Sequence, residues 1–323
     1  MELERLEGEN LFEHKLRLCK AKLNHEIDLD WQEIVDLLEL NVSADHLRKT
    51  AYGILEYDEY IHGFGGVATT ILSISDLHVP FQLPKETLSD YVNKVDILQI
   101  NGDVVDMQSI SKWSKQYRIS PMEEMIQGRQ YLVDLINYIK PKKVVCNYGN
   151  HDKRFATYLA RNLDTDLLEL LPDTSLTLIF ETGFHYYDKR NGTKAFYEPL
   201  CNLFDDIEIE YVDDWKCLIG KTWFVHPLAF KSGVCATAEK AKDYLHDTYK
   251  EPFDCVCMAH THMVGDTTRG YIRLLEQGAF ANTDKITYAD GNLYKPQKQG
   301  FAIICQDADG NLIKEKTKII TLN

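Results

Sequence analysis

The chain has 323 residues, of which 44% are apolar and 27% are charged, so it has enough apolar material for a large core and an accessory module. Its 36 basic and 50 acidic residues give a formal net charge of −14, which excludes a generally basic coat for nucleic acid. An anionic ligand would therefore need a local positive charge.

The N-terminal sequence and the cysteines bear on the compartment. The start, MELERLEGENLFEHKLRLC, has neither the basic residues nor the apolar run of a signal peptide, and no stretch approaches the roughly 20 apolar residues of a membrane-spanning helix. The eight cysteines form no CxxC pair and mostly occupy apolar, strand-like contexts. We therefore expect a cytoplasmic protein with reduced thiols and no membrane contact.

Residues 1–62 are expected to form a small all-α module. Apolar residues recur with a helical period within residues 31–60, which predicts two helices. Asp30 and Glu33 have the spacing of a capping box at the start of the first helix, and Ser43 is the expected N-cap of the second. Helix, short turn, helix resembles a helix-turn-helix unit.

The charge of this module argues against a role in reading DNA. Residues 1–60 contain 7 basic and 15 acidic residues, a net charge of −8 that would repel a phosphate backbone. Arg48 and Lys49 are candidates for a DNA contact, but we favour a helical cap or an oligomer contact with a solvated acidic face. The glycines within residues 62–66 predict a linker, and a second domain is expected at residues 67–323.

From residue 67 the chain alternates β-rich runs with helices and loops. A long helix is predicted from Ser120 and Pro121 onward, and residues 184–200 are expected to be an irregular insertion near an active face. Early strands separated by a helix favour parallel pairing, and later hairpins favour antiparallel pairing. We therefore expect an α/β fold with two mixed β-sheets sandwiched by helices. Ten strands are predicted, at residues 67–74, 95–100, 142–147, 207–212, 215–219, 221–225, 254–259, 270–276, 301–306 and 317–322.

Five apolar runs in this second region are followed by residue types that commonly bind metals. In an α/β sheet such side chains converge beyond the carboxyl ends of the strands. Carboxylates, an amide oxygen and imidazoles without thiolate suit Mn²⁺, Fe²⁺ or Zn²⁺. In the pairs D-x-H and H-x-H, an extended backbone would place both side chains on one side. The segments are Asp76-Leu77-His78, Gly102-Asp103-Val104-Val105-Asp106, Gly149-Asn150-His151-Asp152, His226 and Ala259-His260-Thr261-His262.

These motifs, in this order over residues 70–262, resemble those of the calcineurin-like metallophosphoesterase superfamily. The resemblance implies two divalent ions bridged by Asp103, which lower the pKa of a shared water and neutralise phosphoryl charge. It also implies that His151 acts on the substrate without binding metal. Arg154 is a candidate phosphate clamp, with a surface ion pair as the equal alternative. One ion would be held by Asp76, His78, Asp103 and His262, and the other by Asp103, Asn150, His226 and His260.

Some of these assignments have competitors. His185 and His246 fall in the same interval as His226, but His185 lies in the irregular segment and His246 in a helix-like stretch, so we favour His226. We expect Asp106 and Asp152 to orient other groups by hydrogen bonds rather than to bind metal.

Departures from the family pattern narrow the substrate. The chain has GDVVDMQS and GNHD, which resemble the Ser/Thr protein phosphatases poorly and are closer to the nuclease and phosphodiesterase branches; Ala259 replaces the usual glycine before H-x-H. We therefore expect hydrolysis of phosphodiesters in DNA, RNA or a nucleotide-derived compound, with Mn²⁺ as the first choice of ion. The alternatives are a phosphomonoesterase or small-molecule pyrophosphohydrolase, and a DNA-binding regulator with a degenerate catalytic domain. Homo-oligomerisation through the N-terminal helices is a further expectation.

Overall fold

The chain divides into two compact units, Met1–Gly66 and Val67–Asn323. The linker predicted at residues 62–66 lies outside the described residues. Within the described part of the chain, no helix has the length and apolar character needed to cross a membrane. The computed structural model describes residues 3–6, 9–23, 26–58, 67–112, 119–168, 171, 174–189, 191–286 and 296–322.

The first unit contains the helices α1 (Leu11–Leu23), α2 (Trp31–Leu37) and α3 (Ala44–Asp58). The two predicted helices are confirmed, and α1 is an additional helix. The Asp30 side chain accepts from the backbone N–H of Glu33 in a complete capping box, and Ser43 Oγ accepts from the N–H of His46. The helices enclose a small core of Leu18, Cys19, Ile34, Val35, Leu38, Leu47 and Ala51.

The two basic residues considered for a DNA contact both pair within α3. Arg48 lies 2.9 Å and Lys49 lies 2.7 Å from the carboxylate of Asp45, and all three side chains are exposed. Exposed ion pairs of this kind contribute little to stability. They nevertheless place a negative charge directly beside both cations.

The second unit contains a six-stranded sheet with the order β13-β12-β1-β2-β3-β6. Its strands β1, β2, β3 and β6 run parallel, whereas β12 and β13 are antiparallel to their neighbours. The bounds are β1 (Thr69–Ile74), β2 (Ile97–Asn101), β3 (Lys143–Asn147), β6 (Glu208–Val212), β12 (Gln299–Gln306) and β13 (Lys318–Leu322).

A five-stranded sheet has the order β10-β11-β9-β8-β7. Its central strands β8, β9 and β11 are parallel, and β7 and β10 are antiparallel edges. All ten predicted strands are present, and β10 is an additional strand whose sequence VGDTTR lacks an apolar alternation. The bounds are β7 (Lys216–Ile219), β8 (Thr222–Val225), β9 (Cys255–Met258), β10 (Val264–Arg269) and β11 (Ile272–Gln277).

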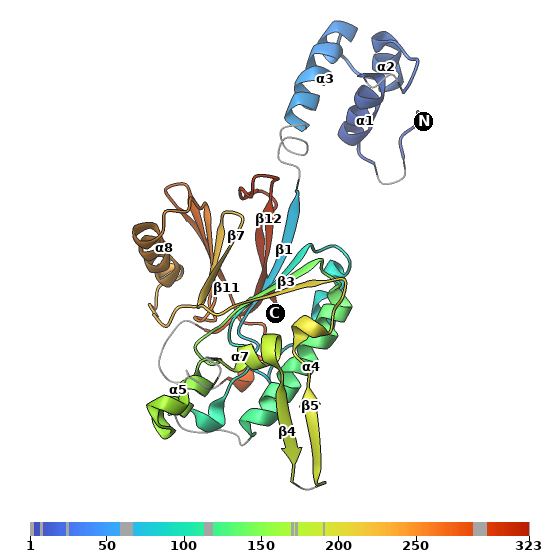
Figure 1. Ribbon diagram of the computed structural model, residues 1–323. Helices are drawn as coiled ribbons and strands as arrows, with labels where there is room; N and C mark the ends of the chain where they lie inside the picture. Colours follow the sequence, from blue (N-terminus) through green and yellow to red (C-terminus); the bar gives the residue numbers. More distant parts are fainter. Residues whose placement is uncertain are drawn as a thin grey trace. The chain divides into compact units, whose positions relative to one another are not determined.

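The two sheets pack face to face and helices cover their outer faces (Figure 1). Ile71, Val145 and Phe224 lie in the core between the sheets. The helix α4 (Pro121–Ile139), which begins with the predicted Ser120 cap, covers the first sheet, and α8 (Ala236–Thr248) covers the second. This confirms the α/β fold with two mixed sheets between helices. The eight cysteines are free thiols.

The prediction of an irregular segment at residues 184–200 is wrong. This part of the chain forms the hairpin of β4 (Phe184–Asp188) and β5 (Thr193–Tyr197), with Gly192 in the turn at a φ of 65°. The ribbon stands apart from both sheets, so only its base is buried and the sequence lacks the usual apolar alternation. The remaining short helices are α5 (Arg154–Asn162), α6 (Thr165–Leu168), α7 (Ser175–Thr177), η2 (Lys85–Tyr91), η3 (Gln108–Ile110), η4 (Leu178–Thr182), η5 (Leu200–Asn202) and η6 (Thr283–Lys285).

Candidate metal centre

The five segments with candidate ligands each begin just after a strand. Asp76 and His78 follow β1, Asp103 follows β2, and the other segments follow β3, β8 and β9. These strands are parallel within their own sheets, so their carboxyl ends meet at one edge of the two-sheet core. The fold therefore brings the side chains together although they span almost 190 residues of sequence.

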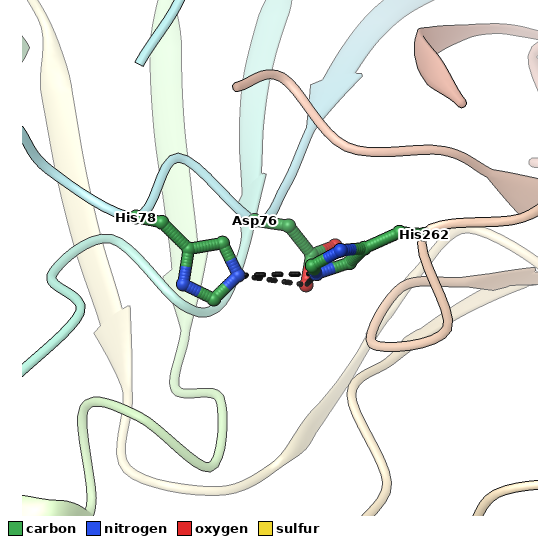
Figure 2. Close-up of side chains that lie close together, drawn as sticks. All are labelled: Asp76, His78 and His262. Carbon is green, nitrogen blue, oxygen red and sulfur yellow. Dashed lines mark hydrogen bonds and ion pairs between the residues drawn. The ribbon is translucent and has the colours of Figure 1, made fainter. Parts of the chain in front are cut away.

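One group of ligand atoms comes from Asp76, His78 and His262, which point toward one another in Figure 2. The Nε2 atoms of the two histidines lie 3.1 Å apart, and Nε2 of His262 lies 3.2 Å from Oδ1 of Asp76. The other carboxylate oxygen of Asp76 accepts from the Ser75 hydroxyl at 2.7 Å and from the backbone N–H of His260 at 3.2 Å. These donors leave Oδ1 directed toward the histidines.

A second group comes from Asp103, His226 and His260, and Asp103 also lies in a group with His78 and His151. Nε2 of His226 lies 3.2 Å from Oδ2 of Asp103, while Nε2 of His78 lies 3.9 Å from the same oxygen. Asp103 thus lies between the histidines of the two groups.

The hydrogen bonds of the ring Nδ1 atoms determine which ring nitrogens carry a proton. Nδ1 of His226 lies 2.7 Å from the carbonyl oxygen of Asn101, and Nδ1 of His78 lies 3.1 Å from a carboxylate oxygen of Asp106. Both partners are acceptors, so Nδ1 donates, and Nε2 is the nitrogen that each ring can offer to a cation.

Gln297 fixes the orientation of His262 in the same way. Its amide nitrogen donates to the carbonyl of Ile286 at 2.8 Å, which turns its oxygen toward Nδ1 of His262. The sequence contained no signal for this role, because Gln297 follows no strand and belongs to none of the motifs. A partner that orients a ligating imidazole is typical of metal sites.

Three buried ligand atoms test whether a cation fits this site. Oδ1 of Asp76, Oδ1 of Asn150 and Nε2 of His226 form no hydrogen bond within the described structure. A buried acceptor without a partner costs about 1–3 kcal/mol. Oxygen and imidazole nitrogen atoms are the donors that borderline divalent ions accept, so a divalent cation would satisfy these atoms.

The electrostatics of the cluster favour positive charge. Burial alone lowers the pKa of His226, but the carboxylates of Asp103 and Asp76 outweigh burial and raise it to about 10. Burial and the nearby His226 together lower the pKa of His260 to about 3. The buried carboxylates therefore attract a cation, whereas His260 remains a neutral ligand.

The local backbone differs from the extended conformation expected for the D-x-H and H-x-H pairs. Asp76, His78 and Asp103 have φ values of 52°, 44° and 53°, and His260 and His262 have values of 82° and 53°. All five residues lie beyond their strands in the left-handed region, which non-glycine residues rarely adopt. Side-chain convergence thus comes from strained loops rather than from strand alternation, and such strain is concentrated at functional sites.

Close contact between two loops explains the glycines of the G-D and G-N-H motifs. A Cβ atom at Gly102, where φ is 75°, would lie 2.5 Å from the backbone nitrogen of Gly149, and one at Gly149 would lie 2.2 Å from Oδ1 of Asp103. The buried carboxylate of Asp152 joins the same loops by accepting the backbone N–H groups of Asp103, Val104, Val105 and Gly149. Burial and the charge of Asp103 raise the pKa of Asp152 to about 7.

His151 lies at the edge of the cluster, between the carboxylate of Asp106 and the guanidinium of Arg154. Its Nδ1 lies 2.8 Å from Oδ1 of Asp106, and Nη2 of Arg154 lies 2.8 Å from its Nε2. Arg154 also donates to the carbonyl of Asp106 at 2.7 Å, so the guanidinium is held beside the ring. Arg154 is partly buried and faces the cluster.

The competing histidines lie elsewhere. His185 packs against Phe196 on the hairpin, and the side chain of His246 is 68% exposed on α8, whereas His226 is buried in the cluster. Ala259 has no positive φ, and its N–H donates to the carbonyl of Val225 at 3.0 Å. Its methyl group is therefore compatible with the loop.

No curated protein sequence matches this chain. Among solved structures, it is similar to vacuolar protein sorting 29 from Cryptosporidium parvum, with 15% identity over 79% of this chain and 97% of that chain and a TM-score of 0.37. It is also similar to a novel archaeal phosphodiesterase, with 13% identity over 78% and 99% of the two chains and a TM-score of 0.35. The profile of the family described as calcineurin-like phosphoesterase matches residues 69–264. The chain therefore belongs to the calcineurin-like phosphoesterase family, and it is a metal-dependent phosphoesterase.

Proposed function

We propose that the chain hydrolyses phosphodiester bonds in nucleic acid or in a nucleotide-derived diester, with two divalent ions. The observation that carries the proposal is that candidate ligand atoms gather in two adjoining groups, one with Asp76 and one with Asp103, and that Asp103 also lies 3.9 Å from His78 of the first group. Paired ions at such a site stabilise both the attacking and the leaving oxygen of a displacement at phosphorus. They also supply the positive field that a chain of net charge −14 otherwise lacks.

The ligand sets follow the two groups. Asp103 would contact both ions, and Asn150 would complete the second set through Oδ1, which has no hydrogen-bond partner among the described residues. The other ligands are histidine or aspartate side chains, all buried except the half-buried His260, and such donors suit Mn²⁺, with Fe²⁺ or Zn²⁺ as alternatives. The proposed sets are Asp76, His78, Asp103 and His262 for one ion, and Asp103, Asn150, His226 and His260 for the other.

When bound, the ions activate water and neutralise charge on the phosphoryl group. Around them, His151 would act as the proton donor. Asp106 accepts the Nδ1 proton of His151 and so orients the ring, with Nε2 as the atom that would exchange a proton with the leaving oxygen. Arg154 lies close enough to Nε2 to bind the same phosphoryl group.

The choice of a diester rests on the sequence around the ligands. GDVVD is followed by Met-Gln-Ser rather than Arg-Gly, and GNHD ends in aspartate rather than glutamate, which separates the chain from the protein phosphatase pattern. The net charge of −8 over residues 1–60 and the pairing of Arg48 and Lys49 with Asp45 disfavour a role as a DNA-binding regulator.

The test compares two small substrates of the metal-loaded full chain. With Mn²⁺ added to metal-stripped protein, we expect kcat/KM for bis-p-nitrophenyl phosphate to exceed that for p-nitrophenyl phosphate. Metal content measured on the same samples by mass spectrometry should approach two ions per chain. A wide preference for the monoester would overturn the diesterase proposal, and one ion at full activity would overturn the two-metal arrangement.

A further inference from the structure

The hairpin of β4 and β5 has two unlike faces. On one face, the Phe184 and Tyr197 rings stack at a centroid distance of 5.2 Å, and Phe184 is buried in the main core. The ribbon is a separate two-stranded sheet, and isolated hairpins are marginally stable in water. This anchored base therefore holds the ribbon on the unit while the opposite face remains accessible.

The opposite face combines aromatic rings with a basic residue. In the hairpin register His185 pairs with Phe196 and Tyr187 pairs with Lys194, and because alternate residues share a face, all four lie on the same side. Tyr187 is 57% exposed and Phe196 is 51% exposed, and His185 and Lys194 are also exposed. We call these four residues the aromatic face.

The charge of the hairpin is opposite to that of the chain. Residues 184–197 contain three basic residues and one acidic residue, a net charge of +2 within a chain of −14. Exposed aromatic rings beside basic side chains form the usual surface for single-stranded nucleic acid, because bases stack on the rings and phosphates contact the cations. A ribbon with this charge balance attracts a polyanion.

The hairpin is also linked to the loops of the metal centre. In α7, which precedes the hairpin, the backbone N–H of Ser175 donates to the carbonyl of Asp152 at 3.4 Å. Just after it, the carbonyl of Glu198 accepts from Arg129 of α4 at 2.6 Å, and Glu124 of the same helix accepts the backbone N–H of Met107. Figure 1 shows the ribbon projecting from the end of the unit at which α5 and α7 lie.

We propose that the aromatic face binds a single-stranded segment of a nucleic-acid substrate, with bases stacked on Tyr187 and Phe196 and a phosphate on Lys194. This inference rests on the proposed diesterase function and specifies its substrate class. The alternative occupant is a second copy of this chain, paired with an open edge of the ribbon. Such pairing uses backbone groups and needs no basic residues, so the positive charge of the hairpin favours nucleic acid.

The test measures binding separately from catalysis. A fluorescein-labelled single-stranded DNA of 20 mixed nucleotides is titrated with the full chain in EDTA, and anisotropy gives Kd. We expect Tyr187→Ala and Phe196→Ala each to weaken binding by about 5- to 100-fold, the range for one lost base stack. The matched control Tyr271→Ala, which removes an aromatic side chain that is 65% exposed on another turn, should leave Kd unchanged.

A second variant addresses the phosphate contact without removing a ring. Lys194→Gln should reduce the slope of log K against log salt by about 0.7, the value for one neutralised phosphate of a single strand. Lys318→Gln, at an exposed lysine of β13, should leave the slope unchanged. This variant keeps the proposal testable if ring removal disturbs the hairpin.

Each outcome has a defined meaning. Unchanged Kd in both ring variants, or no DNA binding by the unaltered chain, would overturn the proposal. The proposal would also be overturned if the ring variants altered only the oligomeric state measured by sedimentation and not DNA binding. The aromatic face would then be a contact between copies of the chain. Hydrolysis of bis-p-nitrophenyl phosphate, measured in parallel, must persist in all hairpin variants. Its absence from the unaltered metal-loaded chain would instead refute the diesterase function.

Discussion

The two units of the chain bury different chemistry. In the described part of residues 1–66 the core is apolar, with Leu18, Ile34 and Leu47 fully buried, and the buried His14 ring reaches the carbonyl of Leu3 at 2.8 Å. In the second unit, Asp76 and several histidines are equally buried, yet three of the candidate ligand atoms have no hydrogen-bond partner among the residues that the structure describes.

This difference shows which part of the chain needs a ligand. An apolar core is explained by folding alone, because burial of apolar surface is itself favourable. Buried acceptors without donors are costly, so their presence indicates a cation that the fold is built to bind. The first unit can therefore be explained without a ligand, and the second cannot.

The largest effect is expected at the carboxylate between the two groups. Asp103→Ala should reduce diester hydrolysis by more than about 10³-fold, because losing a direct ligand costs more than the 10–100-fold typical of a lost outer partner. Metal content and kcat/KM are measured together. Asp243→Ala, at an exposed aspartate of α8, is the control. Full metal content in the Asp103 variant would place the ions elsewhere.

A smaller loss is expected at the residue that acts on the substrate. His151→Ala should retain its ions but lower kcat by about 10²- to 10⁴-fold, the contribution of a general acid. His246→Ala removes an exposed histidine and should have no effect. Loss of metal from the His151 variant would mean that this ring is a ligand instead.

An intermediate effect is expected from the orientation of His262. Gln297→Leu removes the acceptor of its Nδ1 proton and should weaken metal binding by about 10- to 100-fold, with kcat nearly normal at saturating Mn²⁺. Calorimetric titration of metal-stripped protein with Mn²⁺ gives the affinity for the ion. Unaltered affinity would show that packing alone orients the ring.

The smallest effect is expected from removing the first unit. A chain of residues 67–323 should hydrolyse bis-p-nitrophenyl phosphate within about twofold of the full chain, because all proposed ligands and their partners lie in the second unit. Circular dichroism verifies that the shortened chain folds. A folded but inactive protein would show that the helices of the first unit contribute to the activity of the second.

Most of the fold could be predicted because its strands are apolar runs between turn residues. The strands that escaped prediction, β4, β5 and β10, are exposed on at least one side and carry residues such as Tyr187, Lys194 and Asp266. Without a buried face the pattern of the sequence loses its period. The turn at Asn191-Gly192 was the remaining signal for the hairpin.

The candidate site could be predicted as a set of residues but not as a geometry. Strand ends identified the segments because parallel strands share an edge. The left-handed backbone at Asp76 and His262 could not be predicted, since contacts distant in sequence hold it. The same is true of Gln297 and of the carbonyl of Asn101, whose roles depend only on where a histidine ring nitrogen points.

The hydrogen bonds of Asp152 affect whether the site is formed before an ion binds. They join the loops after β2 and β3 through backbone N–H groups and use none of the proposed ligand atoms. These hydrogen bonds therefore hold the two loops together without the help of an ion. The repulsion between the buried carboxylates is therefore overcome when the chain folds. We expect the ion to bind to a preorganised site rather than to drive folding.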